Sequence, residues 1–166
     1  MTPPDGTQLA QAMRQKLAAF IALCTGLDEA TASRAPAGRW SPKEIASHLL
    51  GPDDADMLNL FRVFLAEDAP TLALEAYPEN THFTGSRAAM RFDELLSRVE
   101  TAYRSSADFL AGLTPEQLER QAHIPLFRKT PMGAHPTLAV FADFIVSHID
   151  FHITHMQEIL QELGVS

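Results

Sequence analysis

The chain has 166 residues, 46% of them hydrophobic, and its formal net charge at pH 7 is −8. This length suits one domain around one core, and the acidic balance argues against binding to nucleic acid or to an anionic membrane surface. The single cysteine, Cys24, excludes an internal disulfide framework and a cysteine-based zinc cluster. Because no apolar run suits a membrane span or a signal peptide, we expect a soluble cytoplasmic protein.

Apolar residues at helical spacing predict two helices in the first half of the chain. The first covers residues 7–27. The second begins after Ser41, because the segment Ser41-Pro42-Lys43-Glu44 forms a capping box with proline at the first helical position. Gly51-Pro52 interrupts this helix, and its pattern resumes over residues 57–65. The second helix is therefore predicted in two pieces.

The second half of the chain predicts two further long helices. Residues 66–85 carry prolines and a glycine and are predicted to form a long connection. Ser86 is predicted to cap a third helix that closes near Gly112, and a short capping box follows at 114–117. A last helix covers residues 137–163. Four long helical stretches without an alternating strand pattern indicate an all-α four-helix bundle, in a single domain over residues 1–166.

The last predicted helix carries three histidines on the face that turns toward a bundle core. The residues of this face follow steps of three and four: Phe141, Ile145, His148, His152, His155 and Ile159. Histidine is costly to bury without partners, so packing alone does not explain three of them. Metal ligation does, because imidazoles one helical turn apart, as in His148 and His152, can share a divalent ion. The alternatives are stacked imidazoles in the core or a polar contact between two copies.

A third ligand must come from another part of the chain. His48 is the best candidate because it lies in the second predicted helix, whereas the remaining histidines, His82, His123 and His135, fall in loops. Its alternative role is that of a half-exposed residue completing the capping box one turn after Glu44. Aromatic residues of the last helix are core by default, and only Phe144 or Phe151 is expected to edge a pocket.

Two motifs together resemble the DinB/YfiT-like metalloenzyme superfamily. Its members have a Trp-Ser-x-x-Glu-x-x-x-His segment opening the second helix and a His-x-x-x-His pair on the last helix. In this chain they correspond to Trp40, Ser41, Glu44 and His48, and to His148 and His152. The resemblance implies an up-down-down-up bundle whose crossover is the 66–85 connection, a three-histidine site for nickel, zinc or another divalent ion, and a homodimer.

The chain departs from that pattern at two places. His155 stands where the family often has glutamine, and it is expected to be a fourth ligand, a partner of a ligand or an acid/base group that transfers protons. Gly51-Pro52-Asp53-Asp54 is a break not expected after His48, so the pocket wall beside the metal is expected to differ.

Three neutral imidazoles leave a metal ion with an open position, which is typical of catalytic sites. We therefore expect a metal-dependent enzyme acting on a small molecule, either a hydrolase or a thiol S-transferase. The resemblance implies the thiol option, since related families use low-molecular-weight thiols such as bacillithiol or mycothiol. The alternatives are a stress protein that binds metal or small molecules without turnover, and a structural dimeric bundle. Substrate contacts are expected from the second helix, the 66–85 connection and residues 121–136.

Overall fold

The computed structural model describes residues 4–52, 56–74 and 80–165, and these contain helices, turns and isolated bridges but no strand. In chain order the helices are α1 (Gly6–Cys24), α2 (Glu29–Ala32), α3 (Pro42–Leu50), α4 (Met57–Ala66), α5 (Ser86–Ala89), α6 (Phe92–Ala111), α7 (Pro115–Leu118), the 3₁₀ helix η1 (Pro125–Lys129) and α8 (Leu138–Glu162). Within this part of the chain no helix has the length and apolar character needed to span a bilayer.

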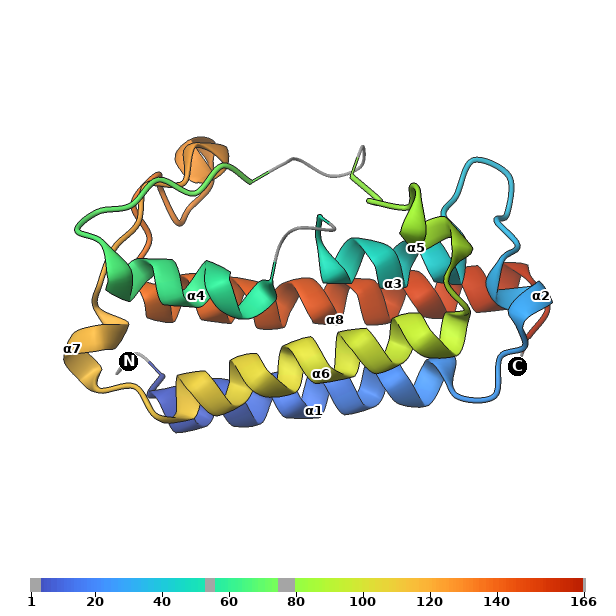
Figure 1. Cartoon of the computed structure of the whole chain (residues 1–166), viewed down its shortest axis with the longest axis horizontal. Coiled ribbons are helices and arrows are strands. Elements are labelled where there is room, and N and C mark those ends of the chain that lie inside the picture. The colour runs from blue at the N-terminus through green and yellow to red at the C-terminus, as the bar shows by residue number, and fades with distance from the viewer. Residues whose placement is uncertain (1–3, 53–55, 75–79, 166) are drawn as a thin grey trace.

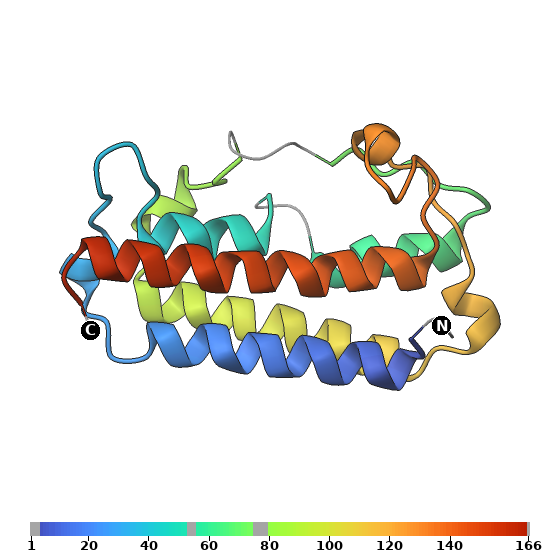
Figure 2. The same ribbon diagram turned by 180° about the vertical axis from the view of Figure 1, so that it is seen from behind.

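Four long helical units make up the bundle, and their directions confirm the predicted topology. Figure 1 shows α1 and α8 running one way and α3, α4 and α6 the other, which is the up-down-down-up order. Because α4 and α6 are parallel, the chain must return along the bundle between them, through the region after residue 66. From behind, Figure 2 shows α1 and α8 side by side, and α1 packs against both α6 and α8.

Helix α1 has the periodicity predicted for it, although it is shorter. Its buried side chains recur at three- and four-residue steps and face the core: Leu9, Met13, Leu17, Phe20 and Cys24. The helix starts one residue earlier than predicted, since Asp5 and Gln8 form a capping box. It ends at Cys24 and not near residue 27, and Gly26 follows with a positive φ of 87°. The short helix α2 lies between α1 and α3.

The second helical unit is in two pieces, as predicted, and an arginine from elsewhere in the chain contacts the end of each piece. The capping box between Ser41 and Glu44 starts α3, and Gly51 ends it with φ 75°. Arg87 donates hydrogen bonds to carbonyl groups at the end of α3, and Arg120 donates to the Phe64 carbonyl near the end of α4. Guanidinium groups at these ends satisfy carbonyls that a helix leaves without internal donors.

The third helix is not continuous from Ser86, so that prediction was wrong. The capping position belongs to Gly85, with φ 51° and no side-chain hydrogen bond. Helix α5 ends at Ala89, with Met90 as its C-cap, before α6 begins. Side chains from residues distant in the chain form hydrogen bonds with the backbone groups at this break. Lys43 Nζ donates to the Met90 carbonyl at 2.6 Å, and a Glu29 carboxylate oxygen accepts from the Phe92 amide at 2.8 Å. These partners lie far away in the chain, which is why local capping signals did not reveal the break.

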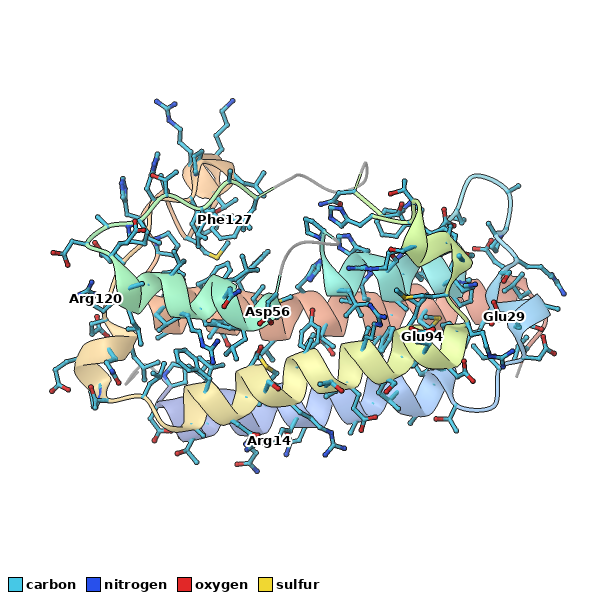
Figure 3. All side chains as sticks on the ribbon, in the orientation of Figure 1. Arg14, Glu29, Asp56, Glu94, Arg120 and Phe127 are labelled. Carbon is cyan, nitrogen blue, oxygen red and sulfur yellow. The ribbon has the colours of Figure 1, made fainter. Side chains whose placement is uncertain are left out.

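Two connections pair with each other over α4 and α8. The Leu72 amide donates to the His123 carbonyl at 2.9 Å, and the His123 amide donates to the Pro70 carbonyl at 2.7 Å. This pairing joins the segment after α4 to the segment before η1. Figure 3 places Phe127 of η1 above α4, at the opposite end of the molecule from Glu29 on α2. The paired connections and η1 thus lie on the side of α4 and α8 that faces away from α1 and α6.

Candidate metal centre

Helix α8 presents its histidines to the core, as its periodicity predicted. Thr137 caps the helix by accepting a hydrogen bond from the Val140 amide, and α8 then continues without interruption to Glu162. His152 is fully buried and His155 is 6% exposed. His148 is half-buried. The same face of α8 therefore carries three imidazoles at successive turns, and the first of them, His148, is more exposed to solvent than the other two.

Helix α3 brings His48 to this face of α8. The capping box at Ser41 sets the start of α3, and His48 lies two turns later, with 8% of its surface exposed. The Nε2 atoms of His48 and His148 are 2.9 Å apart, and those of His148 and His152 are 3.1 Å apart. One ring nitrogen from each of the three lies within 4.8 Å of the others. The three histidines predicted to act together thus form one cluster of nitrogens.

Hydrogen bonding alone does not account for this cluster. His48 Nδ1 lies 2.9 Å from the carbonyl oxygen of Asn80, which only accepts, so a neutral His48 carries its proton on Nδ1 and a lone pair on Nε2. The central nitrogen, His148 Nε2, has at most one hydrogen. If it donates to His48 Nε2, no second hydrogen is left for the contact with His152; if it accepts from His152 Nε2, its lone pair faces that of His48. A cation between the three nitrogens would stabilise all of them, so the donor set fits a metal ion.

Burial keeps these imidazoles neutral, as metal ligation requires. Desolvation, together with the neighbouring His48, lowers the pKa of His148 from 6.5 to about 4. Desolvation and then the nearby histidines lower the pKa of His152 to about 2. The pKa of His48 is also lowered, chiefly by burial and partly opposed by the Asn80 carbonyl. At neutral pH all three nitrogens are therefore in the form that binds a cation.

His155 and Trp40 lie behind the cluster. His155 Nδ1 is 3.5 Å from His152 Nδ1, on the side of the ring that faces away from the cluster. The Trp40 ring lies nearly parallel to His152, at 6.2 Å and 8° between planes, and 5.1 Å from the His48 ring. Trp40 thus packs against two of the cluster residues from its position just before the N-cap of α3. His155 does not belong to the three-nitrogen cluster.

A cavity of about 730 Å³ adjoins the cluster, and His48 and His148 lie in its wall. Its other walls come from the second helical unit, the connection after α4, α6, the region around η1, and α8. These include the three segments predicted to contact substrate. Phe144 and Phe151 both line it, as expected of a pocket edge. Gly51 and Pro52 of the unexpected break also line it, whereas Asp53 and Asp54 lie outside the described residues. His152 and His155 are not among its lining residues.

The remaining histidines divide between the cavity and a separate position. His82 lines the cavity with a positive φ of 52°. His123 and His135 stack on each other, with ring centroids 4.9 Å apart, outside the cluster. Sequence reasoning missed Asn80, whose backbone carbonyl orients His48, because a backbone contact from a connection leaves no signal in residue type.

Comparisons with known proteins identify the fold and the family of this chain. No curated protein matches the chain. Among solved structures, YfiT from Bacillus subtilis has a similar fold, with a TM-score of 0.77 over 97% of this chain and 89% of that one, at 18% sequence identity. That protein is described as a probable metal-dependent hydrolase with an unusual four-helix bundle topology. A family model, that of the DinB superfamily, matches residues 12–156. The chain therefore belongs to the DinB superfamily.

Proposed function

We propose that His48, His148 and His152 bind a divalent metal ion, nickel or zinc, and that the protein is an enzyme acting on a small molecule in the adjoining cavity. The observation that carries this proposal is the convergence of the three ring nitrogens within 4.8 Å at a cavity wall. A divalent ion held by neutral imidazoles lowers the pKa of a water or thiol bound at its open position. Hydrolysis is the first candidate reaction, supported by the description of the similarly folded YfiT.

Thiol S-transfer is the second candidate reaction. It is favoured by the apolar surroundings of His148, whose ring stacks on Phe144 at 6.0 Å. A thiol sulfur is less strongly hydrated than a water molecule, so placing it against apolar side chains costs less desolvation free energy. The two reactions use the same three histidines and differ in the donor that is activated beside them.

His155 acts in this proposal through His152. If Nε2 of His152 faces the metal, its proton is on Nδ1 and is directed toward His155 Nδ1, 3.5 Å away. His155 then carries its own proton on Nε2. This contact supports a positioning role in which His155 fixes the tautomer of His152, and proton transfer to substrate remains the alternative role for the same side chain.

Elemental analysis of protein purified without a histidine tag tests the metal site. We expect near-stoichiometric nickel or zinc in the natural protein and none in a variant with both His148→Ala and His152→Ala. The matched control carries His123→Ala and His135→Ala, which removes the same number of imidazoles from the stacked pair outside the cluster. This control should keep its metal. Equal metal content in both double variants would refute the proposal.

Activity assays then separate the candidate reactions. The metal-loaded protein is offered neutral esters and amides in one series, and an alkyl halide with a small thiol in the other. Release of acid or amine supports hydrolysis, and thioether formation supports S-transfer. Bound metal with turnover in neither series would favour a protein that binds metal without catalysis, and absence of metal would favour a structural bundle.

A further inference from the structure

In the part of the chain that the structure describes, the cavity beside the histidine cluster offers no aspartate, glutamate, lysine or arginine side chain to a ligand. Its walls are mostly aliphatic and aromatic, with side chains such as Leu50, Met57, Leu60, Phe127 and Phe144. An ionic group placed against these aliphatic and aromatic side chains would lose its hydration without gaining a partner, which weakens its binding. The body of a ligand that fits here is therefore uncharged.

Of the polar residues that line the cavity, His48 and His148 belong to the histidine cluster, Asn80 contacts it, and Ser147 adjoins His148 in the chain. His82 also lines the wall. His48 contacts His148 through Nε2 and the Asn80 carbonyl through Nδ1. Elsewhere in the wall, two hydroxyl groups already donate to backbone carbonyls: Tyr103 to Leu49 at 3.0 Å and Thr130 to Phe127 at 2.8 Å. Hydroxyl groups engaged in this way have no hydrogen left to donate to a ligand and can only accept one. The cavity thus has one end suited to a polar head and walls suited to an apolar body.

A row of aromatic rings joins the cluster to the far wall. The ring of His148 lies 6.0 Å from that of Phe144, which lies 4.7 Å from Phe127 on η1. Figure 3 labels Phe127 beneath η1, above the α4 half of the bundle. With a volume of about 730 Å³, the cavity is within the range of pockets that hold drug-sized ligands. A ligand that reaches the nitrogens therefore extends along Phe144 toward η1.

We propose that the substrate is an uncharged, largely apolar molecule with a single polar head group, which lies against His48 and His148 while its apolar body lies along Phe144 toward Phe127. This inference rests on the proposed function, which supplies the metal that would bind the head group. It excludes phosphorylated compounds and thiols that carry several carboxylates as the molecule that fills the cavity.

Two dyes with the same aromatic body test the charge requirement in metal-free protein. N-phenyl-1-naphthylamine is uncharged, whereas 1-anilinonaphthalene-8-sulfonate has the same rings and a sulfonate. In fluorescence titrations we expect the neutral dye to bind about tenfold more tightly or better, because the sulfonate finds no cationic partner. Equal affinity, or tighter binding of the sulfonate, would overturn the proposal.

A pair of matched variants locates the dye. Leu126 and Val140 are large apolar residues with similar exposure, 39% and 41%, but only Leu126 lines the cavity. Leu126→Glu places a charge at the cavity rim with little risk to the fold, and we expect it to weaken binding of the neutral dye at least severalfold. Val140→Glu should leave binding unchanged. A loss of binding in both variants, or in neither, would contradict binding in this cavity.

Hydroxamic acids separate this inference from the proposed metal function. Octanohydroxamic acid is neutral at pH 7 and joins a metal-binding head to an apolar tail, and acetohydroxamic acid has the same head alone. We expect the octanoyl compound to displace the neutral dye from metal-free protein and to bind more tightly after zinc or nickel is added. Displacement without any effect of metal would leave the apolar cavity supported and refute the metal site. Equal binding of both acids to the metal-loaded protein would refute the apolar body.

Discussion

The guanidinium of Arg87 donates a hydrogen bond to the carbonyl oxygen of Ser47 at 3.0 Å, one residue before His48. It also donates to the Gly51 carbonyl at 2.9 Å, and the side chain is nearly fully buried. Carbonyl groups at the end of a helix carry partial negative charge, which stabilises the buried cation. Arg87 therefore holds the last turn of α3, and with it the position from which His48 reaches α8.

Replacing Arg87 with methionine should weaken both the fold and the metal site. The Arg87→Met variant leaves the α3 carbonyls without their donors, and we expect the free energy of unfolding in urea to fall by about 2 to 4 kcal/mol. Metal affinity, measured by calorimetric titration of the folded variant, should fall by about tenfold as His48 loses its support.

Arg98→Met provides the control for this prediction. Arg98 is exposed on α6 and pairs with Glu94 one turn away. Surface pairs of this kind contribute little, so the change in unfolding free energy should be about 0.5 kcal/mol or less. Similar losses in both variants would argue against a special role for Arg87.

Lys43 and Glu29 form a second contact that should stabilise the fold, at the start of α6. Lys43 Nζ lies 2.6 Å from a Glu29 carboxylate oxygen and donates to the Met90 carbonyl at the same distance. Lys43→Met should lower the free energy of unfolding by about 1 to 3 kcal/mol, since it removes a buried donor from both partners. Chemical denaturation measures the loss.

The Glu29 carboxylate adds a pH dependence to this contact. Its hydrogen bond with Lys43 and then that with the Phe92 amide lower the pKa of Glu29. Its contribution to stability is therefore present above the pKa of the unfolded chain, 4.5, and is lost as the pH falls through the lower pKa of the folded state. Glu29→Gln should lack this contribution at neutral pH, and an unchanged acid profile in that variant would contradict the assignment.

Features of this chain could be predicted from the sequence where residues close together in the chain determine them. The box at Ser41 and the histidine face of α8 depend on residues a few positions apart, so their pattern predicted them. The break between α5 and α6 depends on Lys43 and Glu29, which lie many residues away, and it was predicted wrongly. The Asn80 carbonyl beside His48 is likewise a long-range backbone contact and could not be predicted.

Two variants of His155 distinguish a role in positioning His152 from a role in proton transfer. His155→Gln keeps an acceptor for the Nδ1 proton of His152, whereas His155→Ala removes it. If His155 positions His152, metal affinity should fall about tenfold or more in the alanine variant and largely recover in the glutamine variant. If it transfers protons to substrate, neither variant should change metal affinity, and both should lose the same limb of the pH–rate profile.

The metal-free protein should lose stability in mild acid. Burial lowers the pKa of His148 to about 4 and that of His152 to about 2, whereas in the unfolded chain both titrate near 6.5. Below that value the unfolded state binds more protons, so falling pH favours unfolding between about 6.5 and 4. The limiting slope is about 1.4 kcal/mol per pH unit for each histidine.

Urea denaturation of the metal-free protein at pH 8, 6 and 5 measures this slope. The double variant with His148→Gln and His152→Gln lacks two of the buried histidines and keeps His48, so its free energy of unfolding should change less over the same range. A variant with the same slope as the natural chain would show that other groups control acid stability.

The order of the helices also determines when the metal centre can be completed during synthesis. His48 is made early, on α3, whereas His148 and His152 follow only with α8. Because a chain emerges from the ribosome from its N-terminus, a nascent chain that lacks α8 contains only one of the three imidazoles. A single imidazole binds a divalent ion weakly, so the proposed site can bind metal only after the last helix has been made and has packed against α3.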